Sequence, residues 1–196
     1  MSFKLGITGS MGCGKSTVCD MFVDSGVPVW DADKEVHKTY KKGKEGYKAL
    51  VSLHPKLENN DSIDRVLLSN MIRNNEITLK RLEKVIHPIL SSNRDNFITE
   101  NSDKAIIGFE IPLLFETRAD LWLDSVLIVS CSKETQMSRL LKRPKMTEEK
   151  LEILLLRQNQ VPSEEKNYEF AIDSEKGFEE MKGDVIKVIR LIKAKL

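Results

Sequence analysis

One run of residues in the sequence has the types and spacing needed to hold a phosphate group. It is Gly9-Ser10-Met11-Gly12-Cys13-Gly14-Lys15-Ser16-Thr17, which follows the G-x-x-x-x-G-K-[ST] spacing. Glycine tolerates the dihedral angles of a tight loop whose N–H groups point at one anion, and the helix that follows adds the partial positive charge of its N-terminus. Lys15 supplies a charge for the β- and γ-phosphates, and Ser16 supplies a hydroxyl for Mg²⁺. The residues predicted to bind a nucleoside triphosphate are Met11, Gly12, Cys13, Gly14, Lys15, Ser16 and Thr17.

Two carboxylates follow the next strand-like segment. In Val29-Trp30-Asp31-Ala32-Asp33, a carboxylate can accept a proton from a hydroxyl nucleophile or hold Mg²⁺ through water. The alternative is that one of them only caps the helix that follows. We favour the chemical role for Asp33 and the capping role for Asp31.

A basic segment further along the chain could stabilise a transferring phosphate. Gln136, Arg139 and Arg143 share one helix face by i, i+3 and i+7 spacing. Without a phosphate loop this would be an ordinary solvated face. An acidic residue, Glu110 or Glu116, follows an apolar strand and could help to bind Mg²⁺. A structural ion pair with a lysine or an arginine is nearly as well supported.

The elements that must position these residues alternate along the chain. Short apolar strands are predicted at 3–8, 27–30, 105–111, 125–130 and 170–173, and helices at 14–25, 78–86, 133–160 and 182–196. In the helix at 78–86, Thr78 is the predicted cap and Pro88 lies just beyond the end. Alternation of this kind predicts an α/β fold, a P-loop NTPase with a doubly wound parallel sheet of five strands covered on both faces.

The two longest segments between strands are too long for simple crossovers. We interpret them as excursions at the carboxyl edge of the sheet, where such folds bind ligands. The predicted organisation is a core at 1–33, 104–132 and 168–196, a helical acceptor subdomain at 34–103, and a helical lid at 133–167.

Composition excludes several classes of protein. With 196 residues, 40% of them hydrophobic, and a net charge of +1, the chain is expected to be globular, without a general attraction to nucleic acid or to anionic membranes. We find no signal-peptide pattern and no apolar run of membrane-spanning length. The three cysteines, Cys13, Cys19 and Cys131, form no C-x-x-C pair, which favours a reducing cytoplasm. Cys13 is interpreted as a small loop residue, and the other two as core residues.

The reaction class follows from what accompanies the phosphate loop. The D-x-x-G and N-K-x-D motifs of GTPases do not occur in the sequence. A phosphate loop, paired carboxylates and a cationic segment favour a small kinase. The alternatives are a kinase of the same architecture with another acceptor, such as a nucleoside monophosphate, and a regulatory protein that uses ATP as a switch.

In combination, these motifs resemble the dephospho-CoA kinase family. The resemblance runs in order through the phosphate loop, Val27-Pro28-Val29-Trp30-Asp31-Ala32-Asp33, His87-Pro88, Ile111-Pro112-Leu113-Leu114-Phe115-Glu116, the Gln136–Arg139–Arg143 spacing and Gln160. It implies transfer of the γ-phosphoryl group of ATP, with Mg²⁺, to the ribose 3′-hydroxyl of dephospho-CoA, the last step of coenzyme A synthesis. It also implies no nucleic-acid or membrane partner, and a monomer or a weak homo-oligomer.

The resemblance also implies roles for single residues. Asp33 would activate the 3′-hydroxyl, with Lys15 and Arg139 as further catalytic residues, and Arg143 would contact ATP. The acceptor would be bound by Thr8, Asp33, His87, Pro88 and Leu113. The chain departs from the family pattern at Leu156, where an arginine is usual, and at Ser174, where an asparagine is usual; both departures leave the recognition of adenine open.

Overall fold

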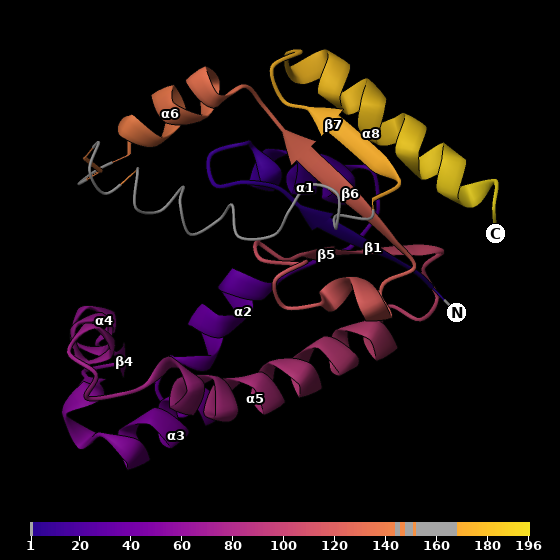
Figure 1. Cartoon of the computed structure of the whole chain (residues 1–196). Coiled ribbons are helices and arrows are strands. Elements are labelled where there is room, and N and C mark those ends of the chain that lie inside the picture. Colours follow the sequence, from indigo (N-terminus) through magenta and orange to yellow (C-terminus); the bar gives the residue numbers. More distant parts are fainter. Residues whose placement is uncertain (1, 144–145, 148–150, 152–167) are drawn as a thin grey trace. The chain divides into compact units, whose positions relative to one another are not determined.

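A computed structural model describes residues 2–143, 146–147, 151 and 168–196 (Figure 1). The chain divides into two compact units, one made of Met1–Trp30 with Asn101–Leu196 and the other of Asp31–Glu100. The predicted lid positions Leu156 and Gln160 lie outside the described residues. Among the described helices, none is both long and apolar enough to cross a membrane.

The first unit is built on a five-stranded sheet. Its strands are β1 (Phe3–Thr8), β2 (Val29–Asp31), β5 (Ile106–Glu110), β6 (Ser125–Ser130) and β7 (Phe170–Asp173). They lie in the order β2-β5-β1-β6-β7, and β1 pairs in parallel with both β5 and β6. The predicted α/β fold with a doubly wound parallel sheet is confirmed.

The strand order places the phosphate loop. From β1 the chain moves first to one side of the sheet, to β2 and β5, and later to the other side, to β6 and β7. The direction of winding therefore changes at β1, and ligands of open α/β sheets bind at the carboxyl ends of the strands where this change occurs. Gly9 to Gly14 follow β1 at that point.

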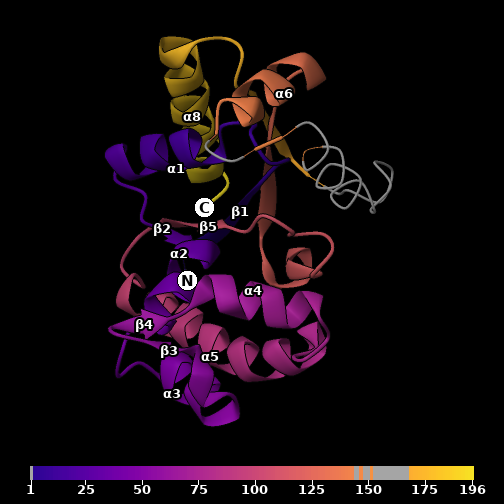
Figure 2. The same cartoon turned by 90° about the vertical axis from the view of Figure 1, so that its left-hand side faces the viewer.

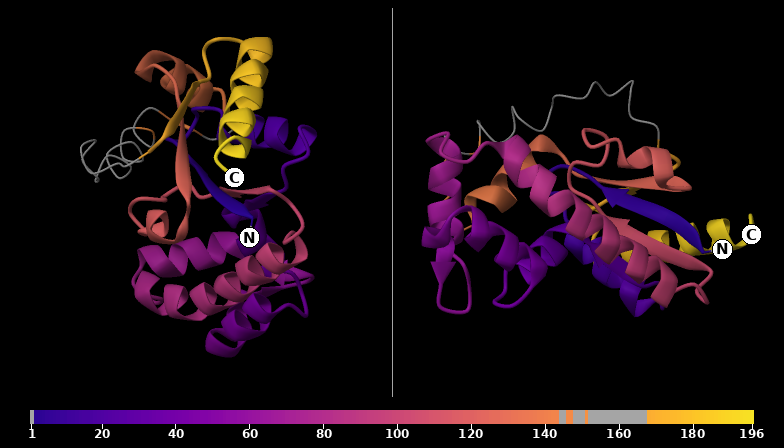
Figure 3. Two further views of the ribbon diagram at one scale, coloured as in Figure 1. Left: turned by 90° about the vertical axis from the view of Figure 1, so that its right-hand side faces the viewer. Right: turned by 90° about the horizontal axis from the view of Figure 1, so that it is seen from below.

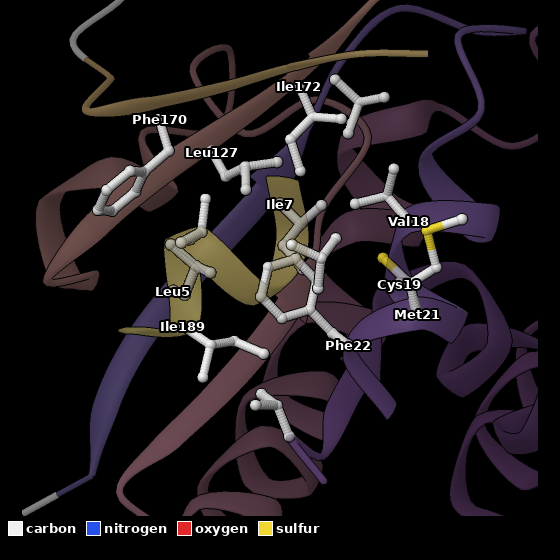
Figure 4. Packing of buried hydrophobic residues seen from close by; sticks show 14 of the residues in the cluster. Leu5, Ile7, Val18, Cys19, Met21, Phe22, Leu127, Phe170, Ile172 and Ile189 are labelled. Atoms are coloured by element: carbon white, nitrogen blue, oxygen red, sulfur yellow. The ribbon is translucent and has the colours of Figure 1, made fainter. Parts of the chain in front are cut away.

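One face of this sheet is covered by α1 (Lys15–Asp24) and α8 (Phe178–Lys193), which can also be followed in Figure 3. Figure 4 shows Leu5 and Ile7 of β1 among side chains from α1, such as Phe22. From α8, Ile189 joins the same cluster. Full burial of an aliphatic or aromatic side chain of this size stabilises a protein by about 1.5–3 kcal/mol, so this cluster is a main source of stability for the unit.

The other face is packed by aromatic rings and by the segment after β5. The ring of Phe109 meets Trp122 edge to face at a centroid distance of 5.0 Å. The ring of Trp30 lies at a centroid distance of 6.1 Å from that of Phe109. Gly6 leaves room for the Leu123 side chain on this face, because a Cβ on Gly6 would lie 2.5 Å from it.

The second unit is helical and has its own core. Figure 2 shows its elements, which are α2 (Ala32–Thr39), α3 (Glu45–Leu53), η1 (Pro55–Leu57), β3 (Glu58–Asn59), β4 (Ser62–Ile63), α4 (Arg65–Arg73) and α5 (Leu79–Glu100). Its buried cluster includes Tyr47, Leu50, Leu57 and Ile77. The mostly helical character expected for this region is confirmed, whereas the β3–β4 pair was not anticipated.

Three predicted helices have different bounds in the structure. Pro88 lies inside α5, so the prediction that the helix ends before it was wrong; a proline in a helix removes one hydrogen bond, and the rest of the helix can compensate for that loss. The Thr78 hydroxyl accepts from the N–H of Arg81 at 3.3 Å, as expected of a cap. Helix α6 spans only Lys133–Leu141, and α8 begins at Phe178, before the predicted start.

Candidate active site

The phosphate loop is shaped by glycines in a backbone conformation that other residues rarely adopt. Gly12 and Gly14 have φ angles of 84° and 83°, in the left-handed region that favours glycine. A Cβ on Gly12 would also lie 2.8 Å from the Leu140 side chain, and a Cβ on Gly14 would lie 3.3 Å from that of Ser174. The loop therefore depends on glycine for its backbone conformation and for the close approach of neighbouring segments.

Lys15 and Ser16 begin α1 directly after the loop. The Lys15 ammonium donates to the carbonyl oxygens of Gly9 at 2.7 Å and Ser10 at 3.2 Å, which holds its charge against the loop. The Ser16 hydroxyl donates to Glu110 Oε1 at 3.4 Å, and Glu110 is buried at the end of β5. A hydroxyl and a carboxylate are the hard oxygen ligands that suit Mg²⁺, so these residues fit a magnesium ion beside a bound nucleotide.

Helix α6 is attached to the loop through its side chains. Gln136 is buried and donates to the carbonyl oxygen of Met11 at 2.7 Å. Arg139 donates to the hydroxyl and the carbonyl oxygen of Ser174, at 2.7 and 3.0 Å, and its NH1 lies 3.5 Å from the carbonyl oxygen of Gly12. Arg139 thus joins the loop, α6 and the residue that follows β7.

The N-terminus of α6 is capped from the same end of the sheet. The Ser132 hydroxyl accepts from the N–H of Thr135 at 3.2 Å. Glu175 accepts from the N–H and the hydroxyl of Ser132, both at 2.8 Å, and from the Thr135 hydroxyl. These hydrogen bonds, that from Thr135 first, lower the pKa of the Glu175 carboxyl, so this group is charged at neutral pH and holds the helix start.

A small cavity of about 150 Å³ opens beside the loop. Thr8, at the end of β1, and Leu113, in the turn after β5, both line it, together with Cys13 and Cys131. The Thr8 hydroxyl donates to the carbonyl oxygen of Ile111 at 2.8 Å, which fixes the turn after β5. The structure thus brings together two of the residues predicted to bind the acceptor.

The second unit carries the paired carboxylates on α2. Asp31 is the N-cap, and its carboxylate accepts from the N–H of Lys34 at 2.9 Å. Asp33 lies in the first turn with an exposed side chain. The capping role predicted for Asp31 is therefore confirmed, and the carboxylate of Asp33 is not used as the cap.

Comparison with known proteins gives the family. The model of a family described as dephospho-CoA kinase matches residues 3–177. The chain belongs to the dephospho-CoA kinase family. Its sequence is 35% identical to the dephospho-CoA kinase of Agrobacterium fabrum, over 99% of this chain and 100% of that protein.

Solved structures are similar over the whole chain. A dephospho-CoA kinase from Campylobacter jejuni superposes with a TM-score of 0.70 at 26% identity, covering 100% of both chains. A protein from Thermus thermophilus, TT1252, superposes with a TM-score of 0.76 at 27% identity, covering 100% of this chain and 98% of that one. The similarity therefore includes both units.

Other residues of the family resemblance lie in the second unit or beyond the end of α6. His87 and Pro88 are exposed on α5, in the second unit. Arg143 lies beyond the end of α6, where Lys142 is the C-cap. The prediction that Arg143 continues the helix face of Gln136 and Arg139 was therefore wrong, because the helix ends before it.

Two features of the site were missed from the sequence. Ser174, noted only as a departure from the family pattern, holds Arg139, and Glu175 caps α6. Their position directly after β7 was a usable signal, since it is the carboxyl end of a strand. Cys131 was predicted to be a core residue, but it is only partly buried because it lines the cavity.

Proposed function

We propose that the protein transfers the γ-phosphoryl group of ATP to the ribose 3′-hydroxyl of dephospho-CoA, giving coenzyme A and ADP. The observation that carries this proposal is the family match over residues 3–177. The phosphate loop supports it, since its glycines, Lys15 and Ser16 have the arrangement that phosphoryl transfer needs.

In this proposal the first unit binds the nucleotide. The loop amides from Met11 to Thr17 surround the phosphates. Lys15 leaves the carbonyl oxygens of Gly9 and Ser10 and donates to the β- and γ-phosphates. The loop amides are fixed by the backbone and stabilise the charge of the transition state without reorganising. Arg139 adds positive charge from α6, and Arg143, beyond the helix, contributes a second guanidinium.

The same site takes Mg²⁺ through the Ser16 hydroxyl, with Glu110 as its buried acidic neighbour. When bound, the ion neutralises charge on the phosphate oxygens. Glu110 accepts the hydrogen bond that orients the Ser16 hydroxyl, so its part is to position a ligand.

The acceptor side depends on Asp33, which orients the 3′-hydroxyl and takes its proton. Thr8 and Leu113, together with His87 and Pro88, bind the rest of the acceptor. The helical segment at 34–103 is proposed as the acceptor subdomain, and 133–167 as the lid that excludes water from the transfer.

An ADP-release assay with Mg²⁺ and ATP tests the function. We expect ADP to form rapidly only when dephospho-CoA is present, and phosphorus to appear on the 3′-oxygen by ³¹P NMR of the product. A parallel panel of nucleoside monophosphates tests the rival kinase. No reaction with dephospho-CoA, or a faster reaction with a monophosphate, would refute the proposal.

The third possibility, an ATP-dependent switch, is separated by the same assay, since a switch would bind ATP without acceptor-dependent turnover. Monomeric or weakly oligomeric state, absence of nucleic-acid partners and a cytoplasmic location belong to the proposal as predictions. Size-exclusion chromatography with light scattering checks the first of these.

A further inference from the structure

Two cysteines meet directly at the phosphate loop. Cys131 follows β6, and its Sγ donates to Sγ of Cys13 at 3.1 Å. The two residues are 118 positions apart in the sequence, so only the fold brings them together. The proposed function uses the backbone of Cys13 and neither thiol. Both cysteines are free thiols in the structure.

We propose that Cys13 and Cys131 are a modification site, in which a peroxide converts the two thiols into a disulfide that closes the nucleotide site reversibly. The proposal goes beyond the kinase reaction, because it concerns the loop itself and involves no acceptor.

The geometry favours bond formation. A disulfide bond is about 2.05 Å long, so the sulfurs need to approach by only about 1 Å from their present separation. Cys131 is partly exposed and lines the cavity of about 150 Å³ beside the loop, which a small oxidant can enter. Cys13 is 4% exposed, so Cys131 is the thiol that the oxidant reaches first.

The protonation of Cys13 agrees with this order. Burial, with a contribution from the neighbouring thiol, raises the pKa of Cys13 to about 12, and Cys13 is therefore a neutral thiol at neutral pH. Because the thiolate is the nucleophile in this chemistry, Cys13 does not make the first attack.

The chemistry then proceeds in two steps. The Cys131 thiolate attacks one oxygen of hydrogen peroxide, the O–O bond breaks, and hydroxide leaves, so Cys131 becomes a sulfenic acid. That hydroxide takes the Cys13 proton and becomes water, and the Cys13 thiolate attacks the Cys131 sulfur. The S–O bond breaks, and the second hydroxide leaves and becomes water with the proton that Cys131 released when it ionised. In sum, two thiols are oxidised to one disulfide, and one peroxide with two protons is reduced to two waters.

The disulfide acts on the part of the loop that must fit a phosphate. Cys13 lies between Gly12 and Gly14, and its N–H donates to the carbonyl oxygen of Ser10 at 3.3 Å. Formation of the disulfide draws the Cys13 sulfur toward β6. This movement displaces the backbone of the phosphate loop, and the bond then holds the backbone in the displaced position. A misplacement of about 1 Å in a catalytic site can lower turnover by about a hundredfold, and we expect a loss of that size in kcat/KM for ATP.

The test treats the purified full chain with hydrogen peroxide, blocks the remaining thiols and maps peptides without reduction. We expect a peptide pair joined through Cys13 and Cys131. As this cross-link forms, binding of a fluorescent ATP analogue should weaken. Reduction of the cross-link with dithiothreitol should restore binding and turnover. Because binding of the analogue needs no acceptor, this readout is independent of the identity of the kinase substrate.

Matched variants separate this bond from general oxidation. The turnover of Cys131→Ser, compared with that of the same variant before treatment, should not change when peroxide is added. Cys19→Ala, which removes the buried thiol of α1, keeps that sensitivity. If Cys131→Ser does not fold, peptide mapping of the wild-type chain decides alone. The proposal is overturned if no such cross-link forms, if the cross-linked chain binds the analogue normally, or if Cys131→Ser is inactivated as readily as the wild type.

Discussion

The phosphate loop and helix α2 position their functional groups in different ways. Around the loop, Gln136 and Arg139 of α6 and Ser174 after β7 are connected by hydrogen bonds to the loop or to one another. On α2, the Asp33 side chain is exposed in the first helical turn, and the local support comes from the capping interaction of Asp31.

The loop is a preformed set of several donors, whereas the site on α2 relies on a single carboxylate. A phosphate has the same shape in every nucleotide, so a rigid set of donors can be arranged before it arrives. By contrast, proton transfer by a general base on an exposed helix turn depends on a single side chain, here that of Asp33. Substitutions at the loop should therefore affect nucleotide binding and turnover together, whereas substitution of Asp33 should affect turnover alone.

The largest expected effect is at Lys15. Lys15→Ala removes the charge that the loop holds against its carbonyl oxygens, and turnover should fall by about a thousandfold, with weaker ATP binding. Steady-state ADP release and calorimetric titration with ATP measure both. Lys187→Ala, an exposed lysine of α8, is the control and should behave as wild type. Equal loss in both variants would contradict a specific role.

The next effect is at Asp33. Asp33→Asn keeps the size of the side chain but cannot accept the proton, so turnover should fall by about a hundredfold while ATP affinity stays unchanged. Asp31→Asn is the matched control, because asparagine caps helices as well as aspartate does, and should retain most activity. Full turnover in Asp33→Asn would remove it as the base.

The stability of the helical unit can be changed without touching either site. In Gly46→Ala, the new Cβ would lie 2.6 Å from the Thr39 hydroxyl, which is held by donating to the carbonyl oxygen of Val36. Overpacking of this kind lowers the free energy of unfolding by about 1–3 kcal/mol, measurable by urea denaturation. Gly183→Ala on α8, where nothing lies within 4 Å, should instead stabilise by up to about 1 kcal/mol. If both substitutions changed the free energy of unfolding equally, crowding of the Thr39 hydroxyl would not be the cause.

The smallest effect is the pH dependence of the α6 cap. Hydrogen bonds lower the pKa of Glu175 below the ordinary value of 4.5, so its contribution to stability is complete above that pH and disappears as the pH falls through the lowered pKa. Thermal unfolding of Glu175→Gln should differ from wild type at pH 7 and converge with it in acid. A difference that persists in acid would indicate another cause. Glu83→Gln, at an exposed position on α5, serves as the control.

The fold and the loop could be predicted because their signals are local. A G-x-x-x-x-G-K-[ST] run between a strand and a helix requires one backbone conformation, and alternating short strands and helices indicate a parallel sheet. The role of Asp31 as a cap was predictable for the same reason, since capping involves only neighbouring residues.

Long-range contacts could not be predicted in this way. The contact between Cys13 and Cys131 and the attachment of Arg139 to Ser174 depend on which strands become neighbours, and β7 is near the end of the chain. The helix predicted at 78–86 was ended too early because a proline usually ends a helix. In α5 the helix continues past it to Glu100, and Ile86 beside it is buried in the core of the second unit.

The attachment of Arg139 to Ser174 has a consequence for synthesis on the ribosome. The phosphate loop emerges well before Ser174, β7 and α8, the helix that packs in the same core as β1. Proteins are made from the N-terminus at about 5–20 residues per second, so while the segments between them are made the nascent chain carries the nucleotide-binding motif without the residues that brace it. Tight nucleotide binding should therefore begin only after Ser174 has emerged, and chains stalled before Ser174 should escape capture by ATP.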